Sequence, residues 1–302
     1  MAVASPSERI LRYILETTPN TTPATPTMET FRRVGGGGLG RKRDSFISEE
    51  ELGHPGEVDL RLGAKKPSLS LDFELSYGTL DAFLASALGN EWAANQLKCG
   101  TLLKTFTIED GHPDIGVFLP AKGMIVDSMS LNIPSNGIIK GSFSFAGMSY
   151  GAVAAATIAN TTNPATTTKA MDSYTGSIQK GGATIATVTS LGISISGNRT
   201  PKFGLMSNEA HHLSRGGLKI ALDITVFFEN GSFLADYDNE TEFELVVTPV
   251  DKAGNSYVFT FPRVRISDED RDKQDGDMIQ KMKGVALWDP DDTAMTIDRI
   301  SA

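Results

Sequence analysis

The sequence predicts a mainly β protein with one amphipathic helix and a long N-terminal arm. Apolar and polar residues alternate over residues 69–75, which is the pattern of a strand with one buried face. Asn136-Gly137 lies between two further apolar segments, and this dipeptide strongly favours a tight β-hairpin turn. The 302 residues also include 30 glycines, which favours many turns over long helices.

The first 66 residues are expected to form an extended N-terminal arm rather than a domain. Ser5-Pro6-Ser7-Glu8 has the form of a helix capping box and predicts a short helix through Glu16. Residues 17–30 are rich in Thr and Pro, and residues 35–38 are four consecutive glycines. A segment with so little apolar content gains order only by docking on another surface.

Residues 67–150 are expected to form a first β unit. Apolar residues between Leu80 and Leu88 follow helical spacing and Gly89 stands at the usual position after a helix, so a helix is predicted over residues 77–89. The other strands of this unit are expected at residues 101–109, 116–119, 124–133 and 138–148.

Residues 151–172 are rich in Ala and Thr and are expected to be a linker or a mobile surface loop. A second β unit is expected over residues 173–302. The acidic residues 268–277 within it are expected to form a charged loop. Its strands are expected at residues 174–179, 185–196, 218–228, 243–247, 257–265, 278–288 and 293–300.

The two units contain a weak internal repeat. Residues 117–120, Val-Phe-Leu-Pro, resemble residues 259–262, Phe-Thr-Phe-Pro, and residues 138–141 resemble residues 281–284. Two explanations are open. Hairpins can resemble each other by composition alone, or one β unit was duplicated in tandem and residues 151–172 join the copies.

Composition excludes several classes of protein. The net charge of −9 argues against ordinary nucleic-acid binding, which needs Lys and Arg to neutralise phosphates. Cys99 is the only cysteine, which excludes an intramolecular disulfide and a zinc site built from cysteines. The longest apolar stretch, residues 151–159, falls far short of a membrane-spanning helix. Arg9 and Arg12 interrupt the first apolar run, so we expect no signal peptide and synthesis in a reducing cytoplasm.

No group of residues predicts catalysis, a cofactor or a metal ion. His211 and His212 are adjacent and therefore point in different directions on a helix or a strand. The acidic residues that begin at Asp268 lack the spacing of a calcium-binding loop, because Ile279 occupies the twelfth position. A structural or interaction protein is therefore favoured over an enzyme.

Several segments carry a family resemblance through their order along the chain. Residues 69–84 are Leu-Ser-Leu-Asp-Phe-Glu-Leu-Ser-Tyr-Gly-Thr-Leu-Asp-Ala-Phe-Leu, and Ala-Leu-Gly-Asn-Glu-Trp follows at 87–92. Later segments are Leu-Lys-Cys-Gly-Thr at 97–101, Lys-Thr-Phe-Thr-Ile-Glu at 104–109, Lys-Gly-Met-Ile-Val-Asp-Ser-Met-Ser-Leu at 122–131 and Gly-Ser-Phe-Ser-Phe at 141–145. In this order they resemble the tail tube (major tail) protein of long-tailed, siphovirus-type bacteriophages. The resemblance extends from about residue 45 to residue 302 and is strongest over residues 69–148.

The resemblance implies an antiparallel β-sandwich or barrel with a flanking α-helix and no enzymatic activity. It implies copies that close into rings and stack as the tube of the virion tail, through which the genome passes into the bacterial host. The implied partners are further copies of the chain and the tape-measure, tail terminator and baseplate or tip proteins. DNA would pass through the lumen without specific binding, and no membrane is involved. A head or tail decoration protein with a β-sandwich is the alternative.

Two assembly questions stay open at this point. The ring is either a homotrimer with pseudo-sixfold symmetry, if the repeat is a duplication, or a homohexamer. An acidic lumen would repel DNA phosphates, and Glu242 and Glu244, which alternate with Phe243 and Leu245, are candidates to face it. In the arm, the candidates for contact with a neighbouring subunit are the basic cluster Arg41, Lys42 and Arg43 and the acidic cluster Glu49, Glu50 and Glu51.

Overall fold

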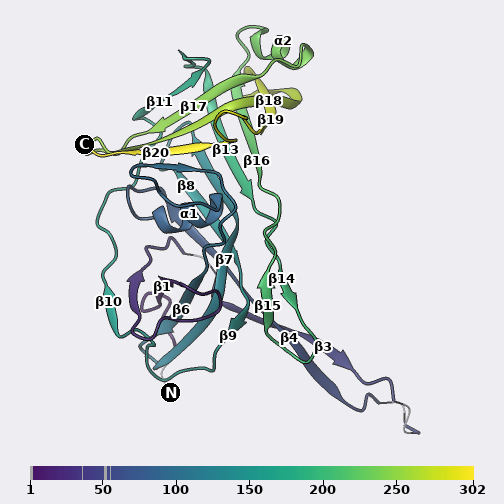
Figure 1. Ribbon diagram of the computed structural model, residues 1–302. Helices are drawn as coiled ribbons and strands as arrows, with labels where there is room; N and C mark the ends of the chain where they lie inside the picture. The colour runs from purple at the N-terminus through teal and green to yellow at the C-terminus, as the bar shows by residue number, and fades with distance from the viewer. Residues whose placement is uncertain (1–2, 36, 51–52, 55) are drawn as a thin grey trace.

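Two long strands, β7 (Val117–Pro134) and β18 (Ser256–Gln274), organise the fold in the computed structural model (Figure 1). The structure describes residues 3–35, 37–50, 53–54 and 56–302. The N-terminal part of each long strand belongs to a small sheet, and its C-terminal part belongs to a sheet that runs through the whole molecule. The chain is thus mainly β, as the sequence predicts, and most of its strands belong to one large mixed sheet.

The sheet that runs through the molecule, here called the long sheet, joins the two halves of the chain. Its strand order in the described chain is β3-β4-β8-β7-β13-β16-β19-β18, and every neighbouring pair is antiparallel. The strands besides β7 and β18 are β3 (Gly40–Ile47), β4 (Leu60–Glu74), β8 (Lys140–Ala146), β13 (Val188–Ser196), β16 (Lys219–Phe227) and β19 (Asp277–Ala286).

A small sheet flanks each end of the long sheet. In the first half, β1 pairs with β2 and β6, and β7 pairs with β6 and β9. In the second half, β11 pairs with β12 and β17, and β18 pairs with β17 and β20. The strands are β1 (Ile10–Leu15), β2 (Thr27–Thr30), β6 (Phe106–His112), β9 (Ser149–Tyr150), β11 (Gly176–Lys180), β12 (Ala183–Thr184), β17 (Phe243–Pro249) and β20 (Thr296–Ile300).

The remaining strands are short and peripheral. β5 pairs with β20, β10 runs parallel to β2, and β14 and β15 form a separate hairpin. Their bounds are β5 (Gln96–Lys98), β10 (Thr161–Asn163), β14 (Pro201–Phe203) and β15 (Ala210–Leu213). The segment expected as a linker, residues 151–172, contributes β10 and packs on the body of the protein, with Met171 fully buried.

The helix α1 (Asp81–Leu88) fills the space between the first small sheet and the long sheet. Phe83 is fully buried, with ring centroids 4.5 Å from Tyr13 of β1, 5.0 Å from Phe106 of β6 and 5.2 Å from Phe145 of β8. These tilted and edge-on contacts are the preferred geometries of aromatic pairs. The predicted helix therefore forms, although it begins at Asp81 rather than at residue 77.

The two halves of the described chain share one pattern of strand pairing. β4, α1, β6, β7 and β8 correspond in order and in pairing to β16, α2 (Ser232–Asp238), β17, β18 and β19. The bulges agree as well: the register shift at Val126/Ser128 of β7 corresponds to the shift at Ile266/Asp268 of β18. β1 and β3 correspond likewise to β11 and β13. The unit boundaries expected at residues 66, 150 and 172 stay a prediction.

The helix predicted to run through Glu16 is wrong, because the chain forms β1 there. All six residues of β1 pair with β6, and Leu11 is only 1% exposed. The capping-box pattern is local, whereas the backbone partner of this segment lies about a hundred residues away. The side chain of Glu16 is buried too, and it accepts hydrogen bonds from Thr105, Thr107 and the Gly123 amide.

The loop predicted over residues 268–277 is also wrong, because β18 continues to Gln274 and turns directly into β19. Asp275 and Gly276 both have positive φ, as the central residues of a type I′ hairpin turn require. Acidic residues of β18 lie beside lysines of β19: Asp268 contacts Lys283 at 3.2 Å, and Asp272 contacts Lys281 at 2.6 Å.

A buried ion pair holds the start of the chain on the first small sheet. Asp110 of β6 accepts hydrogen bonds from Arg9 Nε at 2.6 Å and from the Leu39 amide at 2.9 Å. The side chains of Arg9 and Asp110 are 8% and 1% exposed. Removal of one partner from such a pair costs more than removal of both, because the remaining charge stays buried.

We expect Asp110→Ala to lower the free energy of unfolding by about 3 kcal/mol, because it removes the carboxylate from a buried pair. The control is Asp59→Ala, which breaks an exposed pair with Arg61 and should cost less than about 1 kcal/mol. Urea denaturation of both variants measures the difference. Equal losses would show that the buried pair does not anchor the N-terminal segment.

Candidate functional site

One face of the long sheet is open and lined by small polar side chains. Alternation along each strand sends apolar residues into the core and the residues between them outward. The outward positions of four central strands are mostly serines, with hydroxyls that contact one another across strands, as Ser130 and Ser142 do at 2.8 Å. The serines are Ser68, Ser70, Ser128, Ser130, Ser142, Ser144, Ser190, Ser194 and Ser196.

Charged side chains also lie on this face, and most of them belong to strands of the second half of the chain. The acidic members include Asp72, Asp223, Asp268, Asp270 and Asp272, and the lysines are Lys140, Lys219, Lys281 and Lys283. Lys281 donates a hydrogen bond to Asp272, and this bond holds the pKa of the Asp272 carboxyl below its usual value. The face therefore presents hydroxyls and mixed charges, which suits contact with solvent or weak contact with a polar molecule.

The long sheet ends in two strand edges that no described strand covers. β3 pairs with β4 alone, and residues 265–274 of β18 pair with β19 alone. Unpaired edges are ready partners for a strand of another chain. The basic cluster Arg41, Lys42 and Arg43 lies on the first edge, and the acidic run 268–272 lies on the second.

Glu242 and Glu244, the candidates for an acidic lumen, lie outside the long sheet at the start of β17. Glu242 receives hydrogen bonds from the Arg263 guanidinium at 2.8 Å and 3.1 Å, and these bonds lower its pKa. Glu244 is exposed. Their position relative to a lumen stays a prediction.

The candidate contact residues of the arm are split by the structure. Arg43 donates to the carbonyls of Leu62 and Gly63 within its own hairpin, and Arg41 lies over the Tyr150 ring at 4.4 Å. Glu49 and Glu50 are exposed beyond the end of β3. Glu51 lies outside the described residues.

The β3–β4 hairpin projects from the body beside the β14–β15 hairpin (Figure 1). Exposed apolar side chains gather on these two hairpins. The Lys65 amide donates to the Asn208 carbonyl, and Lys65 pairs with Glu209 at 2.8 Å, so the two hairpins support each other. Large apolar side chains that are more than 45% exposed on these hairpins are Phe46, Ile47, Leu60, Leu62, Leu205 and Met206. In the sequence, this patch is visible only as single apolar residues in a polar segment.

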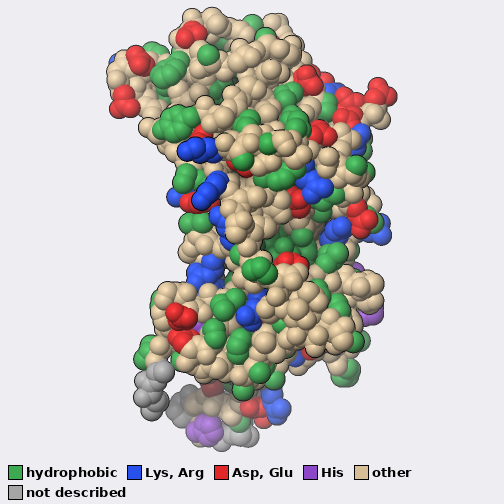
Figure 2. Space-filling model, turned by 90° about the vertical axis from the view of Figure 1, so that its left-hand side faces the viewer, with side chains coloured by type: hydrophobic (Ala, Val, Ile, Leu, Met, Phe, Trp, Pro, Cys, Tyr) green, Lys and Arg blue, Asp and Glu red, His purple; other side chains and the backbone are tan. Residues whose placement is uncertain are grey.

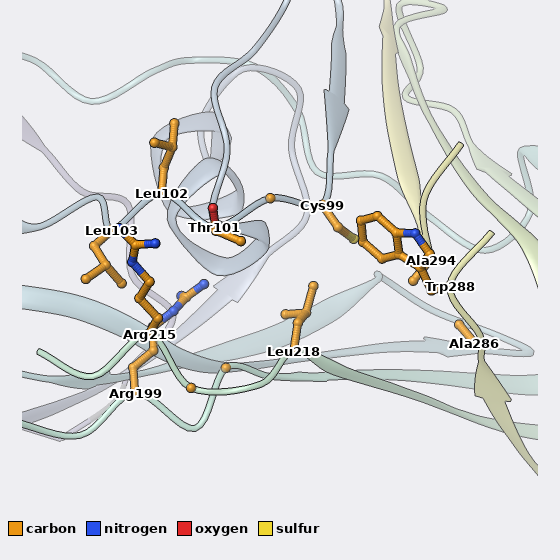
Figure 3. Close-up of a pocket in the computed structure, with 13 residues that line it drawn as sticks. Cys99, Thr101, Leu102, Leu103, Arg199, Arg215, Leu218, Ala286, Trp288 and Ala294 are labelled. Carbon is orange, nitrogen blue, oxygen red and sulfur yellow. The ribbon is translucent and has the colours of Figure 1, made fainter. Parts of the chain in front are cut away.

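A cavity of about 270 Å³ lies at the C-terminal end of α1 (Figure 3). Arg199 borders it and is 4% exposed; its guanidinium donates to the carbonyls of Ser86, Ala87 and Val126. Burial lowers the pKa of Arg199 and raises the pKa of the nearby Cys99 thiol, so Cys99 is a poor nucleophile. The arrangement fits a helix cap rather than a reaction centre.

The described residues contain no group of three or more His, Cys, Asp or Glu side chains placed to hold a metal ion. In the same residues no helix is long and apolar enough to cross a membrane. On the face seen in Figure 2, basic side chains gather across the middle, and acidic side chains concentrate toward the end that the second half of the chain forms.

We expect Arg199→Met to destabilise the protein by about 3 kcal/mol, because it leaves three buried carbonyls without their donor. Arg215→Met is the matched control, since Arg215 borders the same cavity but is exposed, and its loss should cost less than about 0.5 kcal/mol. Thermal unfolding of the two variants checks this. Similar melting temperatures would contradict the role of Arg199 as a cap.

Comparison with known proteins agrees with the resemblance of the sequence segments. The model of the phage tail tube protein family matches residues 6–286, which is nearly the whole chain. No curated protein matches the chain significantly. Because the match covers every strand of the long sheet in both halves, the chain belongs to the phage tail tube protein family.

Proposed function

We propose that copies of this chain close into rings that stack as the tail tube of a siphovirus-type phage and conduct its genome into the bacterial host. The observation that carries the proposal is the long sheet, which has one buried face, one polar face and two uncovered edges. A sheet of this kind is incomplete in a single chain. Further copies would cover its edges and leave the polar face toward a channel.

The shared strand pairing of the two halves supports a trimeric ring. Each chain supplies two similar four-stranded segments of the long sheet. Three chains would then supply six such segments with pseudo-sixfold symmetry. A homohexamer would double that number, and it is the alternative that the ring mass must exclude.

The serine-rich face of the long sheet is the surface we assign to the lumen. Strands lie about 4.8 Å apart, so three copies of eight strands span a circumference of roughly 115 Å and a diameter of roughly 37 Å before strand tilt widens it. Serine side chains are short and leave most of this width free. Glu242 and Glu244 lie outside the long sheet and, in this arrangement, would act from the rim rather than from the wall.

A wall of hydroxyls and mixed charges suits a conduit for DNA. Each Lys or Arg that neutralises a phosphate adds a salt-dependent contact, and many such contacts would hold the passing genome. On the open face, two lysines lie beside a carboxylate: Lys281 beside Asp272 and Lys283 beside Asp268. Their charge is therefore compensated before DNA arrives.

The wider setting follows from the family and forms part of the same proposal. The tube would sit in the virion tail after synthesis in the host cytoplasm, with the tape-measure, tail terminator and baseplate or tip proteins as partners. Catalysis plays no part in this function. A decoration protein with a β-sandwich is the competing assignment; it would bind a preformed lattice as separate copies.

Electron microscopy and native mass spectrometry of the purified protein test this proposal. We expect stacked rings or tubes, and a ring mass of three chains of 32.3 kDa each, or roughly 97 kDa. A ring of six chains would replace the trimer by the hexamer and leave the tube intact. Dispersed single chains at high concentration, in all salts tried, would favour the decoration protein.

A further inference from the structure

We propose that β18 of one copy pairs antiparallel with β3 of the neighbouring copy, with Asp268 opposite Lys42 and Glu269 opposite Arg41. The inference rests on the proposed ring and names the contact that closes it. The partner is a second copy of this chain, and both strand edges needed for the contact are uncovered in the described structure.

The pairing of β7 with β13 inside one chain is the template for this contact. In the spatial order of the long sheet, β7 is the edge strand of the first half and β13 is the edge strand of the second half that lies beside it. β18 is the counterpart of β7 in the second half. It pairs with β17 and β19 as β7 pairs with β6 and β8, and it has a bulge at the corresponding position. β3 occupies in the first half the place of β13, beside β4 rather than β16. The junction that joins two halves within a chain can therefore recur between chains.

The register follows from the bulges and the pairings already present. The bulges place Ser128 of β7 in the same position as Asp268 of β18. Through the pairings of β4 and β16, Ser196 of β13 takes the same position as Lys42 of β3. Because Ser128 lies opposite Ser196, Asp268 is expected opposite Lys42. One step along, Met129 opposite Ile195 gives Glu269 opposite Arg41.

Charge supports this register independently of the template. Both residue pairs bring a carboxylate opposite a basic side chain, which favours an antiparallel contact. Within its own chain, Lys42 instead lies opposite Lys66, and like charges in that position are unfavourable. Lys42 forms no ion pair with the described residues, whereas Asp270 already lies opposite Lys281 of its own chain. Asp268 of a neighbouring copy would supply the opposite charge that Lys42 lacks.

Disulfide trapping tests the register directly. Residues directly opposite in antiparallel strands have Cα atoms about 4.5–5.5 Å apart, which a disulfide can span. In assembled protein, we expect Lys42→Cys combined with Asp268→Cys to form links between chains on oxidation and to give a covalent trimer. The native Cys99 is buried and stays in place.

Two double variants serve as controls. Ser128→Cys with Ser196→Cys tests the template pair within one chain, and it should give an internal disulfide and a monomer on denaturing gels. In the variant that combines Lys42→Cys with Asp272→Cys, the two cysteines would lie about 13 Å out of register along the strand and should not link. Tubes that assemble without a Lys42–Asp268 link would overturn the pairing and leave the tube function standing. Failure of the unmodified chain to assemble at all would overturn both.

A charge exchange covers the case in which the cysteine variants do not assemble. We expect Lys42→Glu or Asp268→Lys alone to raise the protein concentration needed for assembly roughly three- to tenfold, because each brings like charges together. The combination of both changes restores opposite charges and should recover most of the loss. A double variant that assembles no better than the worse single variant would contradict the contact.

Discussion

The backbone pairing of β7 with β13 is the constraint on which the rest of the structure depends. It joins the four long-sheet strands of the first half to the four of the second, and it buries Met129 and Leu131 beside Ile193 and Ile195. One hydrophobic cluster consequently runs through both halves. If this pairing were absent, each half would have an uncovered strand at both edges of its part of the long sheet, and neither would have a continuous core.

Local patterns predicted the parts of the fold whose partners lie close in sequence or whose faces differ in polarity. Alternation identified β4 and β16, Asn136-Gly137 identified the β7–β8 turn, and helical spacing identified α1. Local patterns do not predict β1, because its partner β6 is far away in the chain. The β18–β19 hairpin was missed because its charges suggested a loop, although Asp275-Gly276 is a hairpin turn signal of the same kind as Asn136-Gly137.

The candidate site was harder to predict than the fold. Alternating serines in β4, β8 and β13 were visible in the sequence, but only strand order shows that they share one face. The sequence indicates the basic cluster 41–43 as a contact candidate, whereas it predicts a loop for the acidic counterpart on β18. A strand edge is a property of pairing, so no composition of a single segment reveals which strands remain uncovered.

The two halves are similar in pairing but different in detail, and this difference bears on the symmetry of the assembly. α1 is buried between sheets, whereas α2 lies at the surface and buries only Phe233 among its described residues. The link between β3 and β4 is a projecting hairpin, and the link between β13 and β16 contains the β14–β15 hairpin that supports it. In the proposed ring, the sheet facing the lumen would therefore repeat six times and the projecting hairpins only three times. A partner that contacts the wall would encounter sixfold geometry, and a ring that stacks on the hairpins would encounter threefold geometry. Stacking can thus fix the rotation of one ring on the next, because three projecting sites leave half as many equivalent settings as six.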